Sequence, residues 1–206
     1  MSITNHAELK TAVANWLKRN DLTSYIDDFI ALAEVRINRD VASFIRPLRA
    51  LESQATGVVN TETLALPTGY AGTKRFSLTI GGSDRVLEYG TPEQVARFDH
   101  DGLPVYYTIN GSNFHIYPHP VAGYDYKLDY LKNLDSLSLG ANWLITNAPD
   151  VYLYGTLLQA TPYIKNDKRI PVWEGLYQKA LNDLEMQNEK EFAGNVSLRM
   201  KARGAV

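Results

Sequence analysis

The chain of 206 residues contains no cysteine, only 4 histidines and only 3 methionines. Without cysteine it forms no disulfides and no thiolate zinc sites, and it has no thiol nucleophile. No apolar run approaches the roughly 20 residues that a membrane-spanning helix needs. The opening stretch MSITNHAELK lacks the basic-then-apolar order of a secretion signal. We therefore expect that the protein is made in the cytoplasm and does not associate with a membrane.

A large excess of charge is also lacking. Lys and Arg number 21 and Asp and Glu number 23, which gives a net charge of -2. A protein that grips duplex DNA by neutralising phosphates is usually far more basic. Sequence-specific DNA binding is therefore not expected, whereas 45% hydrophobic and 21% charged residues suit an ordinary globular core.

The residues that could carry chemistry form no convincing site. His115 and His119 are four apart, but in an extended segment that spacing spans about 13 Å, too far for one shared metal ion. No phosphate-binding loop or serine nucleophile elbow is present. A small hydrolase using His100 with Asp99 or Asp101 remains an alternative, and it predicts loss of activity in His100→Ala. We expect no enzyme, no cofactor and no metal.

The ends of the chain have helical periodicity. Residues 6–44 predict two helices, with apolar stripes at Leu9, Ala12, Val13, Trp16 and Leu17, then at Ile26, Phe29, Ile30, Ala33 and Ile37. Ser24 followed by Asp27 resembles a capping box for the second helix. Residues 142–192 return to this spacing, with Asn147 as a possible cap, Pro149 in a first turn and Pro162 ending or kinking the helix.

The middle of the chain, residues 48–134, has strand periodicity. Asn110-Gly111 predicts a tight hairpin, because a primed turn needs positive backbone angles. Thr91 with Gln94 predicts a capping box on one short helix. The stretch YDYKLDYL places Tyr124, Tyr126, Leu128 and Tyr130 on one face of a strand. We therefore predict an α+β fold in which N- and C-terminal helices pack around a central antiparallel β region, as a single domain over residues 1–195.

Tyrosine is the one residue type in clear excess, with 13 copies. Tyrosine packs its ring and keeps its hydroxyl at a boundary, which suits core edges and subunit interfaces. The candidate core or interface aromatics are Tyr124, Tyr126, Tyr130, Tyr152, Tyr154, Trp173 and Tyr177. The alternative is a carbohydrate-binding or tail-associated module that stacks ligands on the Tyr-rich strands.

Several stretches, read in order, resemble the head-to-tail adaptor proteins of tailed bacteriophages. They include LALPTGYAGTKRFSL, GLPVYYTINGSNFHIYPHP and NWLITNAPDVYLYGTLLQATPYI, followed by VWEGLYQKAL. The resemblance covers roughly residues 8–200, and the order of the pieces is more specific than any one of them. It implies a structural virion protein without enzymatic activity.

The resemblance also implies partners and a location. Such adaptors form a ring, commonly of about twelve copies, under the portal protein in the neck between capsid and tail. The ring extends the channel for genomic DNA, without sequence-specific binding, and gives a tail or nozzle protein its docking surface. Residues 196–206 would be a C-terminal arm that docks on the portal through Val196, Leu198, Arg199, Met200, Lys201 and Arg203. The alternative for this arm is a disordered end that keeps the chain soluble.

Overall fold

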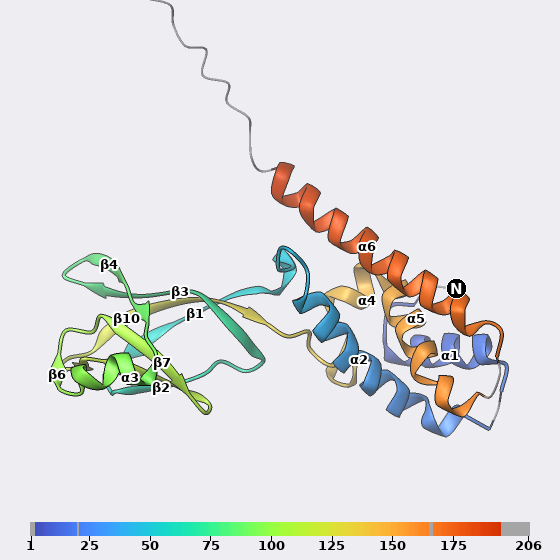
Figure 1. Ribbon diagram of the computed structural model, residues 1–206, viewed down its shortest axis with the longest axis horizontal. Coiled ribbons are helices and arrows are strands. Elements are labelled where there is room, and N and C mark those ends of the chain that lie inside the picture. The colour runs from blue at the N-terminus through green and yellow to red at the C-terminus, as the bar shows by residue number, and fades with distance from the viewer. Residues whose placement is uncertain (1–2, 20, 165–166, 195–206) are drawn as a thin grey trace, which may run out of the picture. The chain divides into compact units, whose positions relative to one another are not determined.

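The computed structural model describes residues 3–19, 21–164 and 167–194. Its contacts divide the chain into two compact units. The helical unit joins the two ends of the chain, residues up to 50 and from 134 onward, and the β unit is formed by residues 51–133. Helices at both chain ends and strands between them confirm the predicted α+β class (Figure 1). That the chain is one domain remains a prediction.

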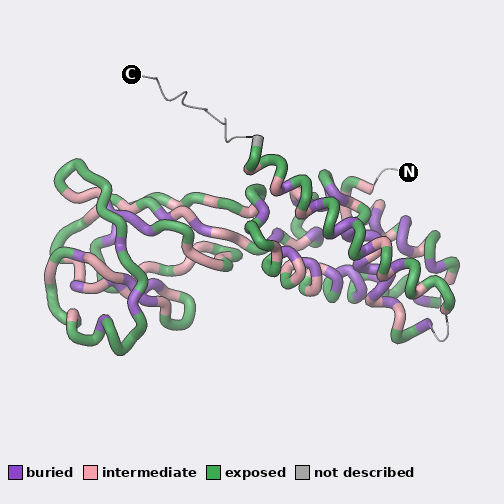
Figure 2. Tube along the Cα trace, turned by 45° about the horizontal axis from the view of Figure 1, so that its top comes forward, coloured by how far each residue is buried: buried purple, intermediate pink, exposed green. Residues whose placement is uncertain are grey.

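The helical unit is built around one central helix. Its helices are α1 (His6–Leu17), α2 (Ile26–Ala42), α4 (Trp143–Asn147), α5 (Pro149–Gln159) and α6 (Ile170–Gly194). Single turns of 3-10 helix lie at Thr23–Tyr25, Arg49–Leu51, Leu137–Leu139 and Thr161–Tyr163. Helix α5 contacts α1, α2 and α6 and is buried on nearly every side, which is why its sequence is apolar all round. Buried and exposed positions alternate along the other helices (Figure 2).

Close helix packing around α5 depends on Gly155. A Cβ atom at this position would lie 3.2 Å from a ring carbon of Tyr177 on α6 and 3.5 Å from Ile37 on α2. The absence of a side chain therefore lets both neighbours approach the α5 backbone. The predicted α2 stripe agrees with this packing, because Phe29, Ile30, Ala33 and Ile37 are buried. The predicted α1 stripe is confirmed except at Trp16, which is 42% exposed.

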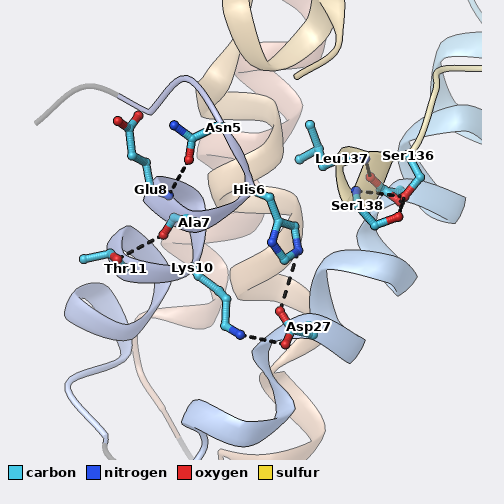
Figure 3. Close-up of polar contacts among 11 residues, drawn as sticks. Asn5, His6, Ala7, Glu8, Lys10, Thr11, Asp27, Ser136, Leu137 and Ser138 are labelled. Atoms are coloured by element: carbon cyan, nitrogen blue, oxygen red, sulfur yellow. Dashed lines mark hydrogen bonds and ion pairs between the residues drawn. The ribbon is translucent and has the colours of Figure 1, made fainter. Parts of the chain in front are cut away.

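The helix ends show which local signals act. Asn5 caps α1, because its side chain accepts a hydrogen bond from the Glu8 amide at 3.0 Å (Figure 3). The capping box expected at Ser24 is wrong: a 3-10 turn leads into α2, and no side chain caps that helix. The Asn147 cap is wrong too, since Asn147 is the last residue of α4 and its side-chain Nδ2 donates to the Trp143 carbonyl at 2.8 Å. Pro162 was predicted to end or to kink the helix, and α5 ends before it, at Gln159.

One polar cluster joins α1 to the start of α2. The Lys10 ammonium lies 2.6 Å from Asp27, and the His6 ring lies 3.6 Å from the other oxygen of the same carboxylate (Figure 3). Asp27 also lies in the first turn of α2, where a negative charge offsets the helix dipole.

The β unit contains two four-stranded sheets and one short pair. Its strands are β1 (Glu52–Val59), β2 (Thr63–Ala65), β3 (Tyr70–Ile80), β4 (Ser83–Val86), β5 (Glu88–Tyr89), β6 (Asp101–Gly102), β7 (Tyr106–Asn110), β8 (Asn113–Tyr117), β9 (His119–Pro120) and β10 (Tyr124–Lys132). The sheet orders are β1-β10-β3-β4, β2-β8-β7-β5 and β6-β9. Most pairs are antiparallel, as predicted, but β5 with β7 and β6 with β9 are parallel. The helix α3 (Pro92–Val95) starts at the predicted capping box of Thr91 and Gln94.

The core of the β unit lies between the two larger sheets. Its buried members are Val59, Phe76, Leu78, Leu87, Tyr107, Phe114, Ile116, Leu128 and Tyr130. Strand β3 supplies Phe76 and Leu78, and strand β8 supplies Phe114 and Ile116, with alternate residues pointing inward. The two sheets therefore bury one common apolar layer.

Two tight hairpin turns contain glycine at the positions where the backbone has a positive φ angle. Gly81 and Gly82 both have positive φ, 58° and 80°, as a type I′ turn between β3 and β4 requires. Between β7 and β8 the two-residue loop is Gly111-Ser112, and Asn110 pairs with Asn113 inside the ladder. The predicted hairpin is confirmed, but its turn lies one residue later than expected, with Gly111 alone at positive φ, 60°.

Candidate interaction surfaces

Two of the predicted aromatics, Tyr152 on α5 and Tyr177 on α6, lie in the interior of the helical unit. Both are 0% exposed. The Tyr152 oxygen accepts a hydrogen bond from the Asn142 amide at 2.7 Å, and burial raises the pKa of Tyr152 to about 12. The Tyr177 hydroxyl donates to Asp40 at 2.7 Å, and burial, followed by this hydrogen bond, raises the pKa of Tyr177. Tyr152 therefore ties α5 to the cap of the preceding helix α4, whereas Tyr177 ties α6 to α2, which is 137 positions away in the sequence.

The other two predicted aromatics of the helical unit, Trp173 and Tyr154, differ in burial. Trp173 is buried, and the Arg169 guanidinium lies over its ring at 5.0 Å. Tyr154 is half-buried and meets the ring of Trp16 edge-on at a centroid distance of 5.8 Å. Trp16 itself is 42% exposed, so this pair reaches solvent.

The three tyrosines of β10 face the core of the β unit. Tyr130 is 8% exposed and stacks on Tyr70 at 6.1 Å, while Tyr126 meets Phe76 edge-on at 6.0 Å. Tyr124 and Tyr126 are half-buried and pack against the same apolar cluster. Their rings are engaged by neighbouring side chains, so β10 does not present a row of open aromatic faces for stacking a sugar or a base.

The histidine and carboxylate residues are arranged differently from either sequence hypothesis. The His100 ring nitrogen lies 3.0 Å from the carbonyl oxygen of Asp101, and Asp99 faces His119 instead. The parallel pairing of β6 with β9 places Asp101 beside His119, which no local pattern predicts. The proposed acid-base pair of His100 with a neighbouring carboxylate is therefore not formed.

His119 is the centre of a cluster that the sequence did not reveal. Its Nε2 lies 3.1 Å from Asp99, and its Nδ1 lies 3.5 Å from Glu62. The two carboxylates approach opposite nitrogens of the ring and do not converge on one point, and the described residues contain no group of three such side chains suited to a metal ion. His115 lies on β8 and does not join the cluster. The arrangement ties together the β1–β2 connection, the segment before β6, and β9.

A shallow hollow on the β1-β10-β3 sheet is lined mostly by polar groups that pair with one another. It is lined by Glu52, Ser53, Gln54, Lys74, Arg75, Asp129 and Tyr130. Lys74 pairs with Glu52, and the Gln54 amide donates to Asp129 at 2.7 Å. Most of its polar groups therefore satisfy one another.

The predicted docking arm, Val196, Leu198, Arg199, Met200, Lys201 and Arg203, lies outside the described residues. Among the helices that the structure describes, none is long and apolar enough to cross a membrane.

In both units the predicted aromatic residues pack mainly against neighbouring side chains. The ordered polar groups, such as those around His119, hold segments of the fold together. The family model for the SU10 adaptor protein matches residues 4–200, and the chain therefore belongs to this family. It is a phage adaptor protein, a structural component of the virion that assembles with other virion components. Adaptors of this kind are normally not enzymes. No curated protein matches the sequence.

Proposed function

We propose that the protein is a head-to-tail adaptor subunit that forms a ring beneath the portal, continues the DNA channel and presents a docking surface to a tail or nozzle protein. The family match over nearly the whole chain carries this proposal. A closed ring needs one patch on each subunit to contact a different patch on the next. The copy number we expect is about twelve.

Exposed apolar side chains on both units supply surface for such contacts. In the helical unit Ile45 is 89% exposed and Leu139 86%, and in the β unit Val121 is 63% exposed. Of the predicted interface aromatics, Tyr124, Tyr126 and Tyr154 keep part of their surface accessible, whereas Tyr130, Tyr152, Trp173 and Tyr177 are buried. The three half-buried residues are the ones that can contribute to a subunit contact.

The charge of the protein suits a channel through which DNA moves. With a net charge of -2, the subunit does not neutralise phosphates overall and so does not hold the duplex by counterion release. Passage without sequence-specific binding is the expected behaviour.

Portal docking is assigned to residues 196–206. This segment begins two positions after the last residue of α6, Gly194, and contains Arg199, Lys201 and Arg203 but no acidic residue. Its apolar residues Val196, Leu198 and Met200 alternate with other residues, the pattern of a segment that docks as a strand. Acidic groups on the portal would pair with the basic side chains.

Co-assembly with the portal protein of the same genome, imaged by electron microscopy, tests the proposal. We expect a ring of copies stacked on the portal. A chain ending at residue 195 should keep its helical circular dichroism, because α6 ends at Gly194, and should lose attachment. A matched variant with Arg199, Lys201 and Arg203 all changed to Gln separates charge from the apolar contacts. A full-length chain that never joins the portal contradicts the adaptor role, and a truncated chain that docks normally contradicts only the arm.

A further inference from the structure

The side of α2 that faces away from the helical core carries an ordered row of exposed residues. The row is Asp28, Leu32, Val35 and Arg39, in which Leu32 is 55% and Val35 54% exposed. Their separations of four, three and four residues are those of a coiled-coil seam. This seam of α2 is opposite the stripe that packs on α5. The helix therefore has a second apolar surface, which its own unit does not bury.

The charges at the two ends of the seam stand apart from the other charged residues of α2. Each of the others is held within the helical unit: Asp27 by Lys10 and His6, Glu34 by Ser136 and Leu137, Arg36 by Glu174, and Asp40 by Tyr177. Figure 3 shows Asp27 turned toward α1 in this way. Asp28 and Arg39 meet no other charged side chain among the described residues, and the Arg39 Nε donates only to the Val35 carbonyl, at 3.3 Å.

The seam is complementary to itself when it is reversed. The midpoint between Asp28 and Arg39 is also the midpoint between Leu32 and Val35. Two copies of α2 laid antiparallel about this point place each Asp28 opposite an Arg39 and each Leu32 opposite a Val35. A parallel pair would instead oppose Asp28 to Asp28 and Arg39 to Arg39, and like charges across such a seam are unfavourable.

We propose that the free subunit pairs with a second copy of itself through an antiparallel contact of α2 with α2. The apolar residues at the centre supply the attraction, and the two Asp28–Arg39 pairs fix the direction and register. The contact is isologous, so it is complete with two copies and does not continue into a ring. It is therefore a property of the subunit before assembly, separate from the ring contacts.

The seam is short, about 16 Å from Asp28 to Arg39 at the rise of an α-helix. Such a contact is smaller than a standard stable interface, so association is expected to be weak and visible only at high concentration. Sedimentation equilibrium of the full chain alone, up to a concentration on the order of 1 mM, should show monomer and dimer. A chain that stays monomeric throughout this range, or that forms only larger rings, overturns the proposal.

Charge reversal tests the register. Asp28→Arg alone and Arg39→Asp alone each place like charges opposite one another twice per dimer, so each should weaken association about tenfold or more. The double variant with Asp28→Arg and Arg39→Asp restores opposite charges at both places and should associate like the original chain. Lys179→Glu, at an exposed position of α6, is the control and should have no effect. Failure of the double variant to recover overturns the antiparallel register.

Disulfide trapping gives an independent test, because the chain has no cysteine of its own. Leu32→Cys and Val35→Cys variants are prepared separately, carry different tags and are then mixed under oxidising conditions. The antiparallel seam predicts that the mixed 32–35 disulfide forms faster than either 32–32 or 35–35. Faster formation of the like pairs overturns the proposal. Both tests use the chain alone, so their result is independent of whether the portal is bound.

Discussion

Tyrosine has different roles in the two units of the protein. In the helical unit, the hydroxyl groups of Tyr152 and Tyr177 each make one hydrogen bond to another element, Tyr152 to the cap of α4 and Tyr177 to α2. In the β unit, tyrosines join phenylalanines in a cluster of ring contacts, in which Phe114 touches Tyr70, Phe76 and Tyr107 at centroid distances of 5.1 to 5.7 Å. These tyrosines of the helical unit thus act through specific polar contacts, and those of the β unit act through apolar contact area.

The largest effect should come from the ring cluster. Phe114→Ala removes a side chain that is 0% exposed and leaves a cavity among three aromatic rings. We expect the free energy of unfolding to fall by about 3–5 kcal/mol. Denaturant titration followed by circular dichroism measures it.

Tryptophan fluorescence follows the unfolding of the helical unit alone. Trp16, Trp143 and Trp173 all lie in the helical unit, so tryptophan fluorescence reports that unit.

The control for Phe114→Ala is Val86→Ala, at a residue 50% exposed on β4, which should change the free energy of unfolding by no more than about 0.5 kcal/mol. Equal effects of the two substitutions would contradict the role given to the ring cluster.

The second effect concerns the phenol hydroxyls of the helical unit. Tyr177→Phe removes a donor to the Asp40 carboxylate, and a hydrogen bond to a charged group contributes about 1.5–3 kcal/mol. Tyr152→Phe should cost less, about 1 kcal/mol, because the Asn142 amide keeps its second acceptor, the Asp135 carbonyl at 2.6 Å. Denaturant titration followed by tryptophan fluorescence measures both. If Tyr152→Phe is the more damaging change, this account of the two hydroxyls is wrong.

The same residues predict an alkaline dependence. Burial raises the pKa of Tyr152 to about 12, whereas an unfolded tyrosine titrates near 10. The folded state therefore disfavours the tyrosinate, and the stability present below about pH 10 is lost as the pH rises toward about 12. The loss over this range should be smaller in Tyr152→Phe than in the original chain.

The sequence predicted the parts of the fold that are determined locally. The α2 stripe, the Thr91 and Gln94 box and the alternation in β10 all follow from spacing, and the structure confirms them. Strand β1 has no clear alternation, because it is an edge strand with both faces largely exposed, so its pairing with β10 could not be predicted. The Ser24 signal failed because a 3-10 turn already places residues 23–25 in helical geometry.

The polar clusters were less predictable than the fold. Asp99 and His119 meet only because β6 and β9 pair in parallel, and Tyr177 reaches Asp40 across 137 positions of sequence. Such contacts depend on which distant segments the fold brings together. Hydrophobic periodicity and turn residues describe only local structure, so they do not predict these contacts. The exposed seam of α2 was not predicted from the sequence, because the exposure of Leu32 and Val35 in the folded unit was needed to identify it.

The smallest effect should come from the exposed ion pairs, in either unit. Asp27→Asn removes the contacts to Lys10 and His6 and also one charge from the first turn of α2. Asp28→Asn removes only the first-turn charge, so the difference between the two variants isolates the contacts drawn in Figure 3. Because the Asp27 side chain is 53% exposed, this difference should be no more than about 1 kcal/mol and should shrink as salt is added. Denaturant titration at low protein concentration, where α2 seams are unpaired, measures it. A larger or salt-independent difference would mean that the helical unit relies on surface charge as much as on its buried phenols.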